Sequence, residues 1–132
     1  ITNVKDLKKL SISKITSAEK INDEQVLFAT DKGLFHYNVK KNSVNRISNF
    51  VNEVTICKGI NSAFFVADLK GNIFEFIFDK NSLYKSKLLV TIKSKSGGAF
   101  MITNILQIPN GNIWFTGTKE TGIGILYNKK KN

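Results

Sequence analysis

Residues 25–37 read QVLFATDKGLFHY, and this stretch decides the fold. A short apolar run ends in a small or hydroxyl residue, a polar turn containing glycine follows, and a second run carries aromatic side chains. Two later stretches repeat the pattern, SAFFVADLKGNIFEF at residues 62–76 and NIWFTGTKETGIGILY at residues 112–127. Apolar runs this short, bounded by turn residues, favour β-strands over helices. The sequence therefore predicts three copies of one β-hairpin unit.

The spacing of the copies indicates how the units are built. Ala29 and Ala67 stand 38 positions apart, and Ala67 and Thr116 stand 49 apart, with the longer interval containing the glycine-rich stretch 93–100. Repeats of about 40–50 residues with four short strands are typical of β-propeller blades. We expect an all-β, partial β-propeller of about three four-stranded blades, in units 12–50, 51–92 and 99–132. The ring would be completed by other copies, other chains or further sequence.

Most strands of this fold can be placed by their apolar runs and by the turns between them. The tripeptides Asp31-Lys32-Gly33, Lys70-Gly71-Asn72 and Pro109-Asn110-Gly111 predict tight turns, because glycine and asparagine accept a positive φ. The expected strands are residues 14–19, 25–30, 34–38, 43–47, 54–58, 63–67, 73–78, 83–90, 103–108, 112–115 and 124–128. The third unit shows no obvious fourth strand. Residues 3–11 either form a strand that completes another blade or, over residues 5–10, a short helical turn.

Residues 102–128 resemble the two-component regulator propeller repeat. Asn110-Gly111-Asn112 followed by Ile113-Trp114-Phe115 carries the resemblance, together with Gly124-Ile125-Leu126-Tyr127-Asn128. Residues 26–38 match equally well, with Leu27 at the usual tryptophan position, and the second unit is a degenerate copy. The resemblance covers about 100 residues and is more specific for propellers in general than for this family.

The resemblance implies a sensor role. Such repeats commonly form the extracytoplasmic region of bacterial hybrid histidine kinases, where they bind glycans or pass a signal between packed protomers. This chain departs from the family in length, since three blades are fewer than the 4–8 of a typical closed ring. Residues 112–116 with Gly122-Ile123-Gly124 also resemble streptogramin lyase blades. That enzyme needs its own histidines, an acid and a metal, whereas this chain has His36 alone.

Composition narrows the class of protein without identifying the ligand. The chain has 132 residues, 42% hydrophobic and 11% aromatic, which indicates a folded core. Its net charge of +10 comes almost entirely from lysine, with Arg46 the single arginine. Because nucleic-acid sites use arginine heavily, we expect no nucleic-acid partner. The lysines reflect either the codon bias of an AT-rich genome or attraction to another anionic partner, such as an acidic glycan or a lipid surface. No apolar run reaches the roughly 20 residues that span a bilayer, so we expect no membrane insertion within this chain.

Several side chains are candidates for a ligand or partner site, each with an ordinary structural alternative. The turn residues Asp31, Lys32, Asp68, Lys70, Lys119 and Glu120 would line one face of the ring, or serve only as turn formers. Trp114 would stack on a sugar or, more often at such a position, pack between blades. His36 and the lone Cys57 are expected to be structural, since neither has a partner at metal-ligand spacing. We expect no catalytic residue, cofactor or metal.

The sequence thus predicts a non-enzymatic binding module in a periplasmic or extracellular sensor, holding a glycan or a protein. An exposed blade edge also predicts self-association or adjoining blades. The alternatives are a lyase-like propeller enzyme and a structural subunit of a larger assembly.

Overall fold

The computed structural model describes residues 8–47, 49–79, 84–117 and 123–128. Within these ranges the chain is all-β, apart from one turn of 3-10 helix, and its strands form three separate antiparallel sheets. Sheet 1 contains β1 (Ile15–Asn22), β2 (Gln25–Thr30), β3 (Gly33–Asn38) and β4 (Ser43–Arg46). Sheet 2 contains β5 (Val54–Lys58), β6 (Ala63–Asp68), β7 (Asn72–Phe78) and β8 (Tyr84–Thr91). Sheet 3 contains β9 (Ile102–Gln107), β10 (Ile113–Gly117) and β11 (Gly124–Leu126).

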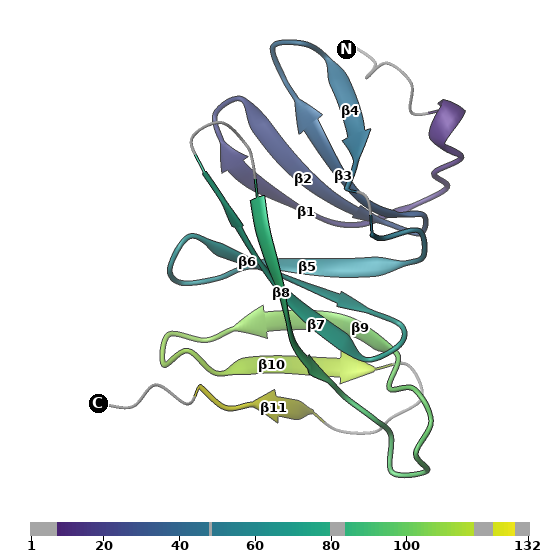
Figure 1. The fold of residues 1–132 in the computed structure, drawn as a ribbon, viewed down its shortest axis with the longest axis vertical. Helices are drawn as coiled ribbons and strands as arrows, with labels where there is room; N and C mark the ends of the chain where they lie inside the picture. The colour runs from purple at the N-terminus through teal and green to yellow at the C-terminus, as the bar shows by residue number, and fades with distance from the viewer. Residues whose placement is uncertain (1–7, 48, 80–83, 118–122, 129–132) are drawn as a thin grey trace.

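In each sheet the strands pair in the order in which they follow along the chain. The all-β prediction is confirmed, and the observed strands lie within a few residues of the expected ones. Sheets 1 and 2 have the four strands expected, whereas sheet 3 has three in the described part of the chain. The sheets are blade-like, and the described residues form no closed ring (Figure 1).

Residues 8–10 form the 3-10 helix η1 (Lys8–Leu10), so this part of the 3–11 segment is a helical turn and not a strand. Residues 3–7 lie outside the described residues.

Glycine makes the tight turns possible. Gly33, Gly71 and Gly111 all have positive φ, at 112°, 86° and 93°, in the three turns that the sequence predicts. At Gly33 and Gly71 the next segment of chain also passes close overhead. A Cβ atom would collide with the carbonyl oxygen of Phe50 at Gly33 and with that of Ile92 at Gly71. These two glycines therefore allow the segment that follows the last strand of the sheet to cross the turn between the second and third strands.

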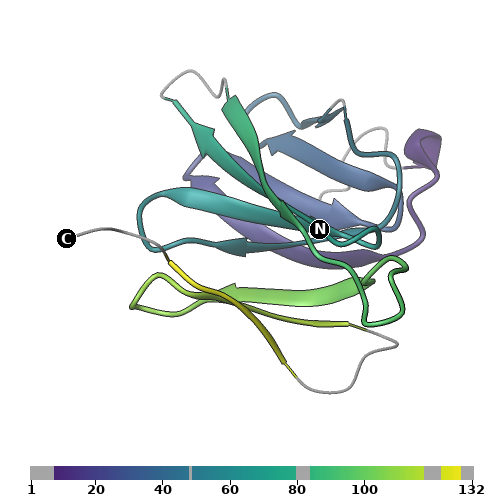
Figure 2. The same cartoon turned by 60° about the horizontal axis from the view of Figure 1, so that its bottom comes forward.

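The first strands of the three sheets lie side by side. β5 contacts both β1 and β9, and the sheets fan out from this line (Figures 1 and 2). Hydroxyl side chains bridge β1 and β5: Thr16 Oγ1 donates to the Val54 carbonyl at 2.6 Å, and Ser17 Oγ accepts from the Ile56 amide at 3.0 Å. Because these contacts run through side chains, the sheets remain separate instead of merging into one.

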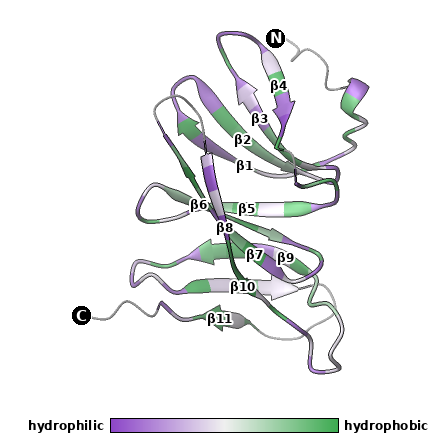
Figure 3. Cartoon of the chain, viewed as in Figure 1, coloured by the Kyte–Doolittle hydropathy of each residue, from purple (hydrophilic) through white to green (hydrophobic). Residues whose placement is uncertain are grey.

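The inner strands of sheet 2, β5 and β6, are buried on both faces, which explains the continuous apolar run of β6. Alternate side chains point to opposite faces of a strand. Phe64 and Val66 pack with Leu27 and Leu34 of sheet 1, in one cluster of buried residues. Phe65, Ala67 and Ile73 belong to a second cluster with residues of sheet 3. β5 and β6 are accordingly among the most hydrophobic strands in Figure 3, and each buried phenylalanine contributes about 2–3 kcal/mol of burial free energy.

Candidate functional site

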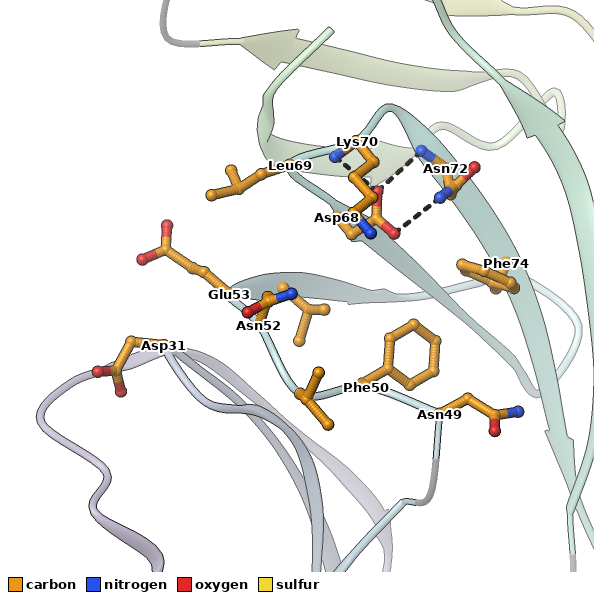
Figure 4. Close-up of a pocket in the computed structure, with 12 residues that line it drawn as sticks. Asp31, Asn49, Phe50, Asn52, Glu53, Asp68, Leu69, Lys70, Asn72 and Phe74 are labelled. Atoms are coloured by element: carbon orange, nitrogen blue, oxygen red, sulfur yellow. Dashed lines mark hydrogen bonds between the residues drawn. The ribbon is translucent and has the colours of Figure 1, made fainter. Parts of the chain in front are cut away.

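An open groove of about 540 Å³ separates sheets 1 and 2 at the edge where their central hairpins turn. Its walls come from residues 49–53 of the link between β4 and β5, from the β6–β7 turn, and from the turn between β2 and β3. Asp31 and Glu53 lie on one side, the turn residues Asp68 and Lys70 on another, and Phe50 below them next to Phe74 (Figure 4). We call this the inter-sheet groove. It brings together three of the residues singled out in the sequence, Asp31, Asp68 and Lys70.

The Asp68 carboxylate shapes its own turn. Its Oδ1 accepts hydrogen bonds from the backbone amides of Lys70 and Asn72, at 2.9 and 3.0 Å, and its Oδ2 accepts one from Asn72 Nδ2 at 2.9 Å (Figure 4). Carboxylates commonly hold turns in this way. Asp68 therefore sets the position of Lys70 and Asn72 at the groove, and both of its oxygens are already engaged.

The Asp31 carboxylate holds the segment that enters β1. It accepts hydrogen bonds from Ser13 Oγ at 2.5 Å and from the backbone amides of Ser13 and Lys14 at 3.1 and 3.2 Å. The Ser13 hydroxyl bond is the main reason that the pKa of Asp31 falls to about 2. Asp31 is therefore an anion at any pH at which the protein would work, and its main contacts are structural.

A salt bridge closes the same side of the groove. Lys14 Nζ lies 2.9 Å from Glu53 Oε1, and the pKa of Lys14 is raised by its hydrogen bond with Glu53. All three carboxylates of the groove, those of Asp31, Glu53 and Asp68, thus already have hydrogen-bond or ion partners.

The floor of the groove is apolar. The rings of Phe50 and Phe74 meet edge to face with centroids 5.1 Å apart, and Val54 lies beside them. Phe50 is buried and belongs to the core cluster between sheets 1 and 2. The floor is therefore part of the core, which fixes its shape before any ligand arrives.

The unengaged polar groups of the groove are the side chains of Asn49, Asn52 and Lys70. None of them has a hydrogen-bond or ion partner among the described residues. An asparagine amide offers both donors and an acceptor, and a lysine offers donors only. Sequence reasoning missed Asn49 and Asn52 because they lie in an irregular link. The signal available was the sequence Asn49-Phe50-Val51-Asn52, in which amides flank an apolar pair.

The other residues singled out in the sequence lie elsewhere. Lys32 is exposed next to Asp31 and does not line the groove. Trp114 lies on β10 in sheet 3, away from the groove, and its indole Nε1 is buried with no hydrogen-bond partner in the part of the chain that the structure describes. Lys119 and Glu120 lie outside the described residues.

His36 has a packing role in sheet 1. Its ring lies 6.4 Å from that of Phe78 of sheet 2 in a stacked arrangement, and its Nε2 is 3.0 Å from Gln25 Oε1. Burial lowers the pKa of His36, which favours the neutral ring. Among the described residues, no group of three or more histidine, cysteine, aspartate or glutamate side chains is placed to hold a metal ion.

A second groove, of about 620 Å³, separates sheets 2 and 3. It lies between the last strand of sheet 2, through Lys87, Leu89 and Val90, and the last described strand of sheet 3, through Leu126. Its lining carries fewer amides than the inter-sheet groove, so it is the weaker candidate for a polar ligand.

No family model and no curated protein matches the chain. No helix in the described ranges is long and apolar enough to cross a membrane.

Proposed function

We propose that this chain is a propeller-type binding module whose inter-sheet groove holds a neutral glycan. Three features support the propeller reading. Each sheet pairs its strands in chain order, the first strands of the sheets lie side by side, and the inner strands of sheet 2 are buried on both faces. These features favour radially stacked blades over a sandwich of two sheets.

The observation that carries the choice of ligand is the set of free groups in the groove. Asn49, Asn52 and Lys70 surround an apolar floor, and the neighbouring carboxylates already have partners. Sugar hydroxyls both donate and accept hydrogen bonds, so amides suit them, and the apolar floor suits the C–H face of a sugar ring.

Charge argues against an anionic ligand at this site. Asp31, Glu53 and Asp68 line the groove together with Lys70, and Lys14 pairs with Glu53 at the same side. The three carboxylates outnumber these two lysines, although the chain as a whole carries +10. A phosphate backbone or acidic polymer would be repelled here, which favours an uncharged ligand.

We propose binding without catalysis, in the extracytoplasmic sensor region of a bacterial two-component kinase. The groove carboxylates are engaged in hydrogen bonds or an ion pair, which favours a recognition role over proton transfer. The sensor assignment, and with it a periplasmic or extracellular location, rests on the resemblance of residues 102–128 to the two-component regulator propeller repeat.

The test is an NMR titration of the ¹⁵N-labelled chain with neutral gluco-, manno-, xylo- and galacto-oligosaccharides, and with an oligogalacturonate as the anionic probe. We expect shifts of the Asn49, Asn52 and Lys70 amide signals with at least one neutral sugar. The double substitution Asn49→Ala and Asn52→Ala should weaken that binding about thirtyfold, because each lost hydrogen bond costs about 1 kcal/mol and about 1.4 kcal/mol is a factor of ten.

Asn61→Ala is the matched control, since Asn61 is an exposed asparagine outside the groove, and it should bind like the unaltered chain. Shifts confined to other surfaces, or binding of the acidic probe alone, would contradict the proposed ligand.

A further inference from the structure

The third sheet has an outer face built like the faces that are buried inside the molecule. Leu27, Phe65 and Trp114 occupy equivalent positions of the three units, 38 and 49 residues apart. Leu27 packs toward sheet 2, and Phe65 packs toward sheet 3. Trp114 occupies the equivalent position of sheet 3. It points away from sheet 2, because its neighbours Ile113 and Phe115 point toward sheet 2.

Trp114 belongs to an apolar row across this outer face. It is directly opposite Leu106 on β9 and Ile125 on β11, so the three side chains share one face. Leu106 is 51% exposed. An apolar row that crosses a sheet and meets solvent is typical of an interaction surface.

Sheet 1 has the reciprocal outer face. Val26 and Phe28 are equivalent to Phe64 and Val66, the two residues through which sheet 2 packs on sheet 1. Tyr37 lies opposite Val26 in the sheet register, and Val44 lies opposite Tyr37, so these residues continue the same face.

The face of sheet 1 carries two charged groups, and each has a partner. Lys20 lies opposite Val26 in the register, and its Nζ lies 2.7 Å from Asp23 Oδ1. Arg46 lies 4.7 Å from the centre of the Phe35 ring, and its Nη1 donates to the carbonyl oxygens of Lys32 and Phe50. Its charge is therefore held by backbone oxygens and by an aromatic ring, which lowers the cost of covering it.

We propose that the outer face of sheet 3 packs on the outer face of sheet 1 of a second copy. The contact repeats, between chains, the stacking of sheet 1 on sheet 2 and of sheet 2 on sheet 3. A second copy is the occupant because its sheet 1 presents side chains equivalent to those that sheets 2 and 3 use for the same contact within the chain.

The contact joins two different surfaces, so it is head-to-tail, and repeating it either closes a ring or extends a chain of copies. It is independent of the glycan groove.

The test is sedimentation velocity over a range of protein concentrations. One sheet face is smaller than a standard interface, so we expect reversible association with a dissociation constant on the order of 10 µM. Leu106→Glu on sheet 3 and Val44→Glu on sheet 1 should each leave the chain monomeric, because each buries a charge in the contact.

Leu88→Glu is the control. Leu88 is 50% exposed, much like Leu106, but it lies on β8 in the middle sheet and on neither outer face. This variant should associate like the unaltered chain. Far-UV circular dichroism and urea unfolding show whether the variants fold, and both altered positions are partly exposed, which favours folding.

A mixture of the two glutamate variants gives the decisive result. Each variant keeps one intact face, so an equimolar mixture should form a one-to-one dimer and nothing larger. A monomeric unaltered chain at about 500 µM, far above the expected dissociation constant, would overturn the proposal. A mixture that stays monomeric would also overturn it. So would a single variant that still dimerises, because that would mean that two copies of the same face pack on each other.

Salt separates this apolar contact from an electrostatic one. Each copy carries +10, so copies repel one another and screening favours their association. We expect the copies to associate more tightly as the salt concentration is raised from low to physiological. Weakening over the same range would mean that charge holds the copies together and would overturn the proposal.

Discussion

The two interfaces that hold the molecule together differ in how far they extend from the inner strands. Between sheets 1 and 2 the core continues outward along β7, where Phe76 lies 5.7 Å from Phe50 and Phe78 stacks on His36. Between sheets 2 and 3 the core is confined to the inner strands. Farther out, the same strand β7 presents Glu75 to a groove and Ile77 to solvent.

The difference follows from what each partner sheet supplies. Sheet 1 covers sheet 2 with four strands and with Ile47 and Phe50 of the link that follows β4. Sheet 3 has three strands in the described ranges, and its outermost one, β11, is short. In this fold, the outer strands of a sheet are therefore buried only where the neighbouring sheet has outer strands to pack against them.

The largest effect that tests this comparison is expected at two adjacent residues of β7. Phe76 is 1% exposed and faces sheet 1, whereas Ile77 is 50% exposed and faces the opposite way. Phe76→Ala should lower the free energy of unfolding by about 3–5 kcal/mol, because it leaves a cavity in the core. Ile77→Ala should cost less than about 1 kcal/mol. Urea unfolding followed by fluorescence measures both, and equal losses would contradict the unequal coverage of the two faces.

The second effect uses Cys57 as a reporter of the interface between sheets 2 and 3. Burial, and then the Glu19 carboxylate, raise the pKa of the Cys57 thiol to about 12. At pH 8 its thiolate fraction, and so its rate with a thiol reagent, should be about a thousandfold below that of the unfolded chain. Because the folded pKa is the higher one, this protection persists until the pH approaches it.

The matched reporter for the other interface is Ile56→Cys in a Cys57→Ala background. Ile56 lies next to Cys57 on β5 but faces sheet 1. We expect slower labelling at position 56 than at 57, because the interface between sheets 1 and 2 is more completely covered. Faster labelling at 56 would reverse the comparison.

A smaller effect tests the two links. The added methyl group of Gly33→Ala would collide with the Phe50 carbonyl in the link after β4, and that of Gly71→Ala with the Ile92 carbonyl in the link after β8. Each should cost about 2–3 kcal/mol, from positive φ and collision together. Gly97→Ala is the control: Gly97 also has positive φ, 87°, but no atom lies within 4 Å of its Cβ position. In thermal unfolding, this change should lower the free energy of unfolding by about 1 kcal/mol, the cost of the positive φ alone.

The strands were predictable because local signals agreed with the fold. Glycine turns and short apolar runs placed them, and the continuous run Phe64-Phe65-Val66 indicated a strand buried on both faces. The unequal extent of the two interfaces was not predictable in the same way, because it depends on which outer strands face each other.

The candidate site was only partly predictable. Asp31, Asp68 and Lys70 were found because turns of equivalent units come to one edge. Asn49 and Asn52 were missed because a link has no periodicity to reveal which residues face a groove. The packing role expected for Trp114 depends on a neighbouring sheet, and the described chain places none over that face.

All the hydrogen-bonded ladders between named strands in the described chain join strands that are neighbours along the sequence. The backbone between sheets 2 and 3 carries no such ladder, only the isolated bridge between Lys93 and Ala99 around the open position of Gly97. A cut or an inserted tag at this point would interrupt no sheet. The loop around Gly97 is therefore the place to divide the protein into two fragments, whose reassembly would report directly on the strength of the contact between sheets 2 and 3.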